Sequence, residues 1–201
     1  MKKLLLTLPA LLLCACAGTS TQGAHDQLVE GTLENTPPDL LEYCKTTACR
    51  ENTQFKLKME DGSSYEYRGA IDPPIVQPDL ITLYPGEDVF IEATIEGDRL
   101  VDMVVVPEVK SPEKTITMKF WQEPSMADGT DMLLQVDNPF EKFLRYELGM
   151  MTFDAEELQY TSSCPVIPGG SGFEHWPYPI FLMAFANLRL VEINDEEVTC
   201  E

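Results

Sequence analysis

The segment from Cys164 to Pro179 holds the densest group of chemically capable side chains in the sequence. A glycine-rich run at 169–172 precedes aromatic and titratable residues that stand between prolines. Loops of this composition often bind ligands or partner proteins, because aromatic rings supply contact area and polar tips supply hydrogen bonds. We favour a second interpretation, in which the segment is a long connection stapled at Cys164 and Trp176 and Tyr178 cover one end of the core. The candidate binding residues are Phe173, Glu174, His175, Trp176 and Tyr178.

Catalytic signatures are absent, so no catalytic residue is assigned. The sequence contains no H-E-x-x-H, P-loop, G-x-S-x-G or EF-hand pattern. A Ser-His-Asp arrangement would have to combine Ser171 with His175, because His25, the other histidine, lies in a polar stretch near the N-terminus. With 34 Asp and Glu residues, a hydrolase that uses a carboxylate pair stays an alternative, but spacing cannot locate the pair.

Metal and cofactor binding have equally little support, so the sequence predicts no metal site and no cofactor. Asp128 with Asp131, and the acidic run at 195–197, could hold Ca²⁺ weakly through carboxylate oxygens. Met150-Met151 could suggest copper, but there is no Met-x-Met or histidine-rich run, and these methionines are interpreted as core filling. A cation-binding or small-ligand-binding role stays an alternative.

The N-terminus combines the parts of a bacterial export signal. Lys2 and Lys3 give a positive start. The apolar run 4–15 is about 18 Å long as a helix, too short for about 30 Å of bilayer hydrocarbon. It ends in Leu13-Cys14-Ala15-Cys16, which resembles the lipobox of bacterial lipoproteins, with a branched apolar residue three places before the modified cysteine and a small residue directly before it. The resemblance covers residues 1–17 and implies a diacylglycerol on Cys16 and cleavage after Ala15.

Acylation of Cys16 would hold the protein on a membrane rather than across it, since two or three acyl chains bind almost irreversibly. The residue that follows the modified cysteine is Ala17 rather than Asp, which resembles lipoproteins that are sorted to the outer membrane. The resemblance therefore implies a lipid-anchored outer-membrane protein that faces the periplasm. An ordinary secretory signal, or a cytosolic protein with an apolar start, are the alternatives. Residues 16–35 predict a lipidated N-terminus with a flexible tether, because they begin with small polar residues.

Four more cysteines lie in the body of the chain: Cys44, Cys49, Cys164 and Cys200. An even number in an exported protein favours disulfides, and four cysteines allow three pairings. We prefer the pairing of neighbours in sequence, Cys44–Cys49 with Cys164–Cys200, because the second bond would hold the C-terminal residues against the body. Zinc or redox chemistry is the competing interpretation, but neither C-x-x-C spacing nor a nearby histidine supports it.

The charge balance excludes nucleic acid as a partner. The chain has 14 Lys and Arg residues against 34 Asp and Glu residues, a formal charge of −20. A polyanion needs a basic surface to neutralise its phosphates, and a chain this acidic repels one at long range. The 201 residues are 44% hydrophobic, which is enough for one core. The sequence therefore predicts one domain over 36–201, after a signal peptide over 1–15.

Alternation of apolar and polar residues predicts an all-β domain after one short helix. Thr36-Pro37-Pro38-Asp39 is typical of a helix start and predicts a helix to about Cys44. Short strands at regular spacing favour a single antiparallel β-sandwich, stapled by disulfides, for which an immunoglobulin-like topology is one guess. The expected strands lie at 55–59, 65–67, 89–95, 101–105, 116–120, 132–136, 143–148 and 180–191.

Side-chain parity predicts the register of two hairpins. A three-residue loop at 60–62, with Gly62 left-handed, pairs Leu57 with Tyr65 and keeps both apolar sets on one face. A two-residue loop would pair Leu57 with a glutamate and spoil that face. The same reasoning predicts a three-residue loop at 96–98, with Ile95 and Val105 on the buried face of the second hairpin.

Together these features predict a lipid-anchored, disulfide-stapled β-sandwich that acts as a binding or structural module of the cell envelope. The expected partner is an envelope protein, reached through an exposed strand edge or through the segment 164–179. An envelope hydrolase that uses carboxylates or His175, and a cation- or small-ligand-binding lipoprotein, are the alternative functions. No nucleic acid is expected as a partner.

Overall fold

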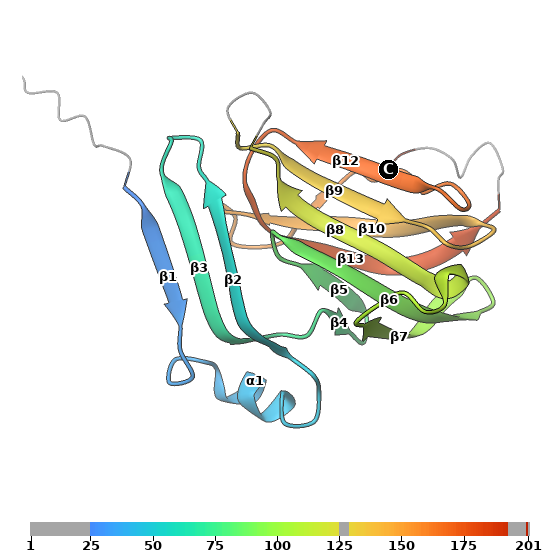
Figure 1. The fold of residues 1–201 in the computed structure, drawn as a ribbon, viewed down its shortest axis with the longest axis horizontal. Coiled ribbons are helices and arrows are strands. Elements are labelled where there is room, and N and C mark those ends of the chain that lie inside the picture. The colour runs from blue at the N-terminus through green and yellow to red at the C-terminus, as the bar shows by residue number, and fades with distance from the viewer. Residues whose placement is uncertain (1–24, 125–128, 193–199, 201) are drawn as a thin grey trace, which may run out of the picture.

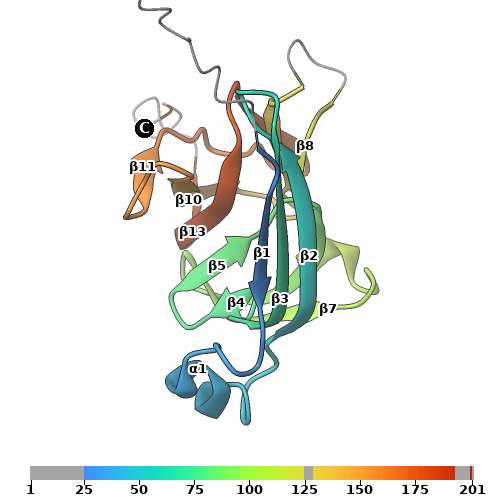
Figure 2. The same ribbon diagram turned by 90° about the vertical axis from the view of Figure 1, so that its left-hand side faces the viewer.

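The computed structural model describes residues 25–124, 129–192 and 200, and its architecture is mostly β (Figure 1). A small sheet has the strand order β1-β3-β2. Its members are β1 (Gln27–Gly31), β2 (Arg50–Lys58) and β3 (Ser64–Asp72). The predicted helix is present as α1 (Pro38–Tyr43), which connects β1 to β2 and lies beyond one end of this sheet (Figure 2).

The hairpin of β2 and β3 has the predicted register. Leu57 pairs with Tyr65, and Phe55 pairs with Tyr67. Gly62 has a φ of +86° in the connecting loop, the left-handed conformation that the three-residue loop requires of it. The register is confirmed because a shift by one residue would move the apolar side chains of β2 to the opposite face of the sheet.

Two expectations near the N-terminus are wrong. Gln27–Gly31 falls in the expected flexible tether but forms β1, which runs parallel to β3. Most side chains of β1 are exposed, so the strand has no periodic apolar face. Its position is set by pairing with β3. Thr36 does not cap α1, because Pro37 occupies the cap position without a side-chain hydrogen bond. The Thr36 hydroxyl donates instead to the carbonyl of Thr32, at 2.8 Å.

The remaining strands form a large sheet with the order β11-β10-β13-β7-β6-β8-β9-β12, and β5 pairs with both β13 and β4. A short 3-10 helix, η1 (Pro112–Lys114), precedes β8. The strands are β4 (Val76–Gln77), β5 (Leu80–Leu83), β6 (Glu87–Glu96), β7 (Arg99–Val106), β8 (Thr115–Gln122), β9 (Met132–Asp137), β10 (Phe143–Thr152), β11 (Gln159–Thr161), β12 (Ser171–Trp176) and β13 (Ile180–Val191).

The large sheet folds over where β7 meets β13, since these strands share a single residue pair, Arg99 with Arg189. As a result β6, β8 and β9 pack against β5, β10 and β13 across one core (Figure 1). This arrangement is the predicted β-sandwich. Its fully buried side chains include Ile91, Ile116, Met118, Phe120, Leu134, Leu144, Leu148 and Phe185.

The second hairpin, β6 with β7, differs from the prediction. Its turn is the two-residue Gly97-Asp98 rather than a loop over 96–98. Asp102, with a φ of +48°, lies in a bulge that sets two residues of β7 opposite one residue of β6. Ile95 and Val105, expected on the buried face, are exposed. Side-chain parity cannot predict a bulge, because it assumes that the residues of the two strands pair one to one on both sides of the turn.

Both preferred disulfides are present. Cys44–Cys49 closes the loop between α1 and β2, and Cys164–Cys200 ties the C-terminal residues to the segment before β12. The four sulfurs are therefore bonded to each other in pairs rather than arranged as a zinc or dithiol site. Across the residues placed by the structure, no helix has the length and apolar composition needed to cross a bilayer.

Candidate functional site

The segment 164–179, expected as an exposed loop, contains a strand. β12 pairs antiparallel with β9 and forms one edge of the large sheet. Its side chains alternate, so that Phe173 and His175 are exposed, Glu174 is half-buried and Trp176 is buried. The structure thus brings Phe173 and His175 to one face and turns the other candidate residues of this strand inward.

The inward-facing aromatic residues close one end of the core. The Trp176 Nε1 group donates to Thr161 Oγ1 at 3.4 Å. Tyr178 is half-buried, and its hydroxyl lies 3.9 Å from Met150 Sδ. These contacts match the favoured interpretation of the segment, in which Trp176 and Tyr178 cover the core.

Glu174 points inward from β12 and has a structural contact. Its Oε1 accepts a hydrogen bond from the backbone N–H of Cys164 at 3.2 Å, which ties β12 to the Cys164–Cys200 staple. Burial raises the pKa of the Glu174 carboxyl above its ordinary value. Burial also raises the pKa of the Tyr146 phenol, and the nearby Glu174 charge adds to that effect.

Ser171 and His175, the pair considered for nucleophilic catalysis, bond different partners. They lie four positions apart on β12, about 13 Å along an extended strand. Ser171 Oγ donates to Asp137 Oδ1 at 2.6 Å, and His175 Nε2 lies 2.5 Å from Asp131 Oδ1. A general base must reach the proton that it abstracts, so this arrangement does not activate Ser171 through His175.

A better-formed site lies beside β7, at the other end of the layer that β12 terminates. It is an apolar cleft of about 580 Å³ whose walls come from 47–50, 74–76 and 103–107. Val104 and Val105 both line this cleft from the edge of β7, although their side chains point to opposite faces of the strand, and 53% and 45% of their surfaces are exposed. A contiguous apolar surface of this kind marks an interaction site more often than scattered exposed side chains do. The cleft's apolar lining includes Ile75, Val76, Met103, Val104, Val105 and Val106.

One edge of β7 faces the cleft without a strand partner. β7 pairs with β6 along one side, and its other side has a single strand pair within the described chain, Arg99 with Arg189. Beyond that pair, the backbone N–H and C=O groups on this side of Val101–Val106 have no strand partner in the described chain. Such a row of groups is a template for another strand. Val105 shares a face with the buried Ile91. Val105 is nevertheless exposed, and β4, which contacts β7, spans only Val76–Gln77.

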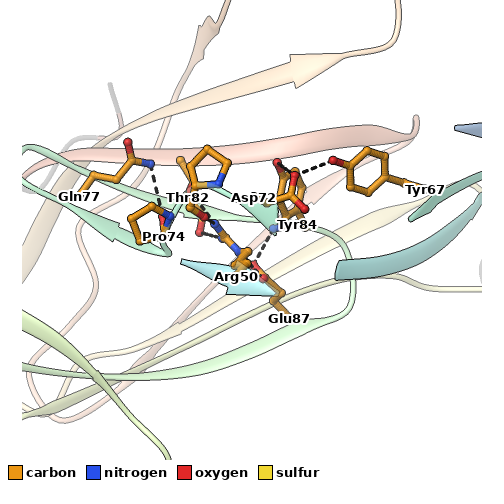
Figure 3. A network of polar contacts seen from close by, with 9 residues as sticks. Arg50, Tyr67, Asp72, Pro74, Gln77, Thr82, Tyr84 and Glu87 are labelled. Atoms are coloured by element: carbon orange, nitrogen blue, oxygen red, sulfur yellow. Dashed lines mark hydrogen bonds and ion pairs between the residues drawn. The ribbon is translucent and has the colours of Figure 1, made fainter. Parts of the chain in front are cut away.

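A buried arginine joins two walls of the cleft (Figure 3). The guanidinium of Arg50 forks onto Glu87, with Nε 2.6 Å from Oε1 and Nη2 2.9 Å from Oε2. It also donates to the carbonyls of Pro73, at 2.6 Å, and Thr82. The guanidinium lies 4.8 Å from the centre of the Tyr84 ring. The bond to Pro73 ties the wall at 47–50 to the residue just before the wall at 74–76, and the paired fork, which is among the strongest side-chain contacts, ties the same wall to Glu87 on β6.

Asp72 fixes the end of β3 that leads into the cleft wall. Tyr67 donates its hydroxyl hydrogen to Asp72 Oδ1 at 2.5 Å, and Tyr84 does so at 3.4 Å (Figure 3). Burial, followed by this carboxylate, raises the pKa of both phenols. The other oxygen of Asp72 packs against Gly69, where a Cβ would come within 2.0 Å of it. A larger residue at position 69 would therefore push the Asp72 carboxyl away from Tyr67 and Tyr84.

Sequence reasoning missed both the cleft and its supporting network. The one local signal was the run Met103-Val104-Val105-Val106, which continues the apolar pattern past the residues that a single buried face needs. Arg50 carried no signal, because its partner Glu87 lies 37 residues away. Only the fold brings them together.

The described part of the chain contains no candidate metal centre. Among residues 25–124, 129–192 and 200, no group of three or more His, Cys, Asp or Glu side chains could hold a metal ion. Asp131 contacts His175, whereas Asp128, the run 195–197 and Cys16 lie outside the described residues.

Comparison of the chain with protein-family models, curated proteins and solved structures finds no significant match.

Proposed function

We propose that this chain is a lipid-anchored protein of the bacterial cell envelope that binds an envelope protein by accepting an extended segment of it along β7. The observation that carries this proposal is the apolar cleft beside an unpaired strand edge. In strand addition, main-chain hydrogen bonds give affinity and side-chain pockets give specificity. Val101–Val106 is about 20 Å long, which matches a strand of ordinary length.

The chemistry of the cleft indicates the kind of segment it takes. The valines of β7 favour apolar side chains on the partner, and the charge of −20 on the chain attracts basic residues around them. Apolar edges are commonly blocked by lysine, proline or a bulge; β7 (RLVDMVVV) contains no lysine or proline, and its bulge at Asp102 leaves Met103–Val106 as the regular apolar part of the edge. An extended segment with alternating apolar and basic residues therefore fits this edge best.

Cross-linking from β7 tests the docking site. A photo-reactive amino acid at Val104 in cells is expected to yield one main adduct with an envelope protein. Val105→Lys in the same chain is expected to lower that adduct about tenfold, because it removes an apolar contact and repels a basic segment. The control position is Phe173, which is exposed on the opposite edge strand β12. An adduct from Phe173 and none from Val104 would move the site to segment 164–179. An adduct with a second copy of this chain would also contradict the proposal.

The anchor is tested separately through Cys16. Support for export comes from the two disulfides, which persist in oxidising compartments. Incorporation of an acyl probe is expected in the wild type and is expected to be lost in Cys16→Ala, with the protein moving from the outer-membrane to the soluble periplasmic fraction. Cys14→Ala is the matched control, because Leu13 is too large for the position before a cleaved bond. Equal labelling of wild type and Cys16→Ala would refute the anchor.

A further inference from the structure

A row of arginines crosses three strands on the outside of the sandwich. Arg99 on β7 lies opposite Arg189 on β13, and Arg189 lies opposite Arg145 on β10. Residues directly opposite in an antiparallel pair project from the same face and lie about 5 Å apart. Leu144 and Leu190, the chain neighbours of Arg145 and Arg189, are buried in the core. The arginines therefore project away from the core, and their exposure falls along the row from the exposed Arg99 through the half-buried Arg189 to Arg145, which is 6% exposed.

Two members of this row lack a counter-charge. Arg99 and Arg189 have no ion pair with any carboxylate in the described part of the chain, although acidic residues greatly outnumber basic ones. Like charges directly opposite each other destabilise a strand pair, so this surface attracts an anion. Other basic residues do have carboxylate partners: Lys45, Arg50, Arg68, Lys110, Lys114, Lys119 and Lys142.

A small pocket opens beside the row. It has a volume of about 190 Å³, and its lining includes Arg145, Arg189 and the hydroxyl-bearing Tyr160 and Thr161. The planar fork of arginine matches the oxygens of phosphate and carboxylate, and hydroxyl groups add neutral donors. Arg145 is buried and has partners of its own, so Arg189 supplies the uncommitted charge. Glu147 also lines the pocket and opposes an anion there.

We infer that this pocket binds a small oxyanion, a phosphate or carboxylate group, held by Arg189 and Arg145 with Arg99 adding charge beside them. Pockets for drug-sized ligands occupy about 300–1,000 Å³, so this one takes a single anionic group rather than a whole large ligand. The charge of −20 repels polyanions more strongly than small anions, so a small anion is the better match for this pocket. The inference uses none of the residues that line the β7 cleft, so it stands or falls apart from the proposed function.

Inorganic phosphate is the first probe. It is titrated into the mature chain with Cys16→Ser, which removes the anchor and leaves every described residue in place, while NMR follows the arginine Nε–H signals. The Arg189 and Arg145 signals are expected to shift along a saturating curve. Arg189→Gln is expected to weaken binding about tenfold, because it removes a charge-assisted contact. Arg68→Gln, on β3, is the matched control and is expected to leave binding unchanged. Glu147→Gln is expected to strengthen it.

Vesicles distinguish the two sources of the anionic group. Binding to phosphatidylcholine vesicles that contain phosphatidylglycerol, lost in Arg189→Gln and competed by phosphate, assigns the group to a lipid headgroup. Phosphate binding without vesicle binding assigns it to a soluble molecule. Arg99→Gln, at an exposed position, is a second variant that folding cannot confound, and we expect about a threefold loss. The inference is overturned when phosphate shifts no arginine signal, or when wild type and Arg189→Gln respond equally.

Discussion

Replacement of Arg50 by alanine is expected to lower the free energy of unfolding by about 3–5 kcal/mol. The side chains of Arg50 and Glu87 are only 7% and 20% exposed, so the substitution leaves a mostly buried carboxylate without its cation. It also removes the donor to the carbonyls of Pro73 and Thr82. Urea unfolding of the two proteins at equal ionic strength measures the difference.

Arg68→Ala is the matched control, since Arg68 is about half exposed and pairs with Glu66 on the surface of the small sheet. Surface pairs of this kind contribute about 0–1 kcal/mol. Similar losses in Arg50→Ala and Arg68→Ala would contradict the role given to the buried pair. The double variant Arg50→Met with Glu87→Leu recovers most of the loss if the cost comes from an unpaired buried charge rather than from lost packing.

The two proposed sites depend on different contacts. Arg50 joins walls of the β7 cleft, whereas Arg189 and Arg145 lie on β13 and β10. A folded Arg50 variant therefore disturbs docking at β7 and leaves phosphate binding intact, and Arg189→Gln does the reverse. This separation means that a failure of one proposal cannot be mistaken for a failure of the other.

The sequence predicted the elements whose apolar residues repeat with period two. In β2 and β3 the position of Gly62 and the parity of Leu57 and Tyr65 admit one register, and the structure has it. β13 has the predicted bounds, 180–191, because its long apolar run admits no other element after Pro179. Local pattern is sufficient where each strand carries its own buried face.

The sequence pattern did not predict elements whose position depends only on pairing with a strand that is distant in sequence. β1 and β12 are edge strands, and each is placed by a neighbour distant in sequence, β3 and β9 respectively. The glycines before β12 suggested a loop, yet Gly172 packs against Val166, where a Cβ would come within 2.8 Å of a methyl carbon. In β7, the bulge at Asp102 broke the parity on which the second register depended. Neither close backbone approach nor a bulge leaves a period in the sequence.

The candidate sites were beyond sequence reasoning for the same reason. The members of the arginine row come from three strands, and the walls of the β7 cleft come from three separate segments. Spacing along the chain cannot reveal a group whose members meet only through strand order. The composition of segment 164–179 indicated a binding loop, but alternation on β12 divides its residues between two faces.

Phe55→Ala is expected to cost about 3–5 kcal/mol, because it opens a cavity where the small sheet meets the sandwich. The Phe55 ring lies 5.6 Å from the Tyr84 ring and 5.5 Å from the Phe181 ring, measured between centroids. Tyr84 follows β5 and Phe181 belongs to β13, so this cluster is a principal apolar contact between the small sheet and the large one. Thermal and urea unfolding measure the loss.

Hydrogen exchange locates where that loss falls. Amides of β2 and β3 are expected to lose more protection than those of β8 and β9. The small sheet loses its aromatic contact with the sandwich, whereas the sandwich core keeps Phe120 and Phe185. Phe173→Ala removes the same side chain from a position that is 65% exposed, against 8% for Phe55, and is expected to change stability by less than about 0.5 kcal/mol. A uniform loss of protection across both sheets would instead mean that they unfold as one unit, with the aromatic cluster as part of a single core.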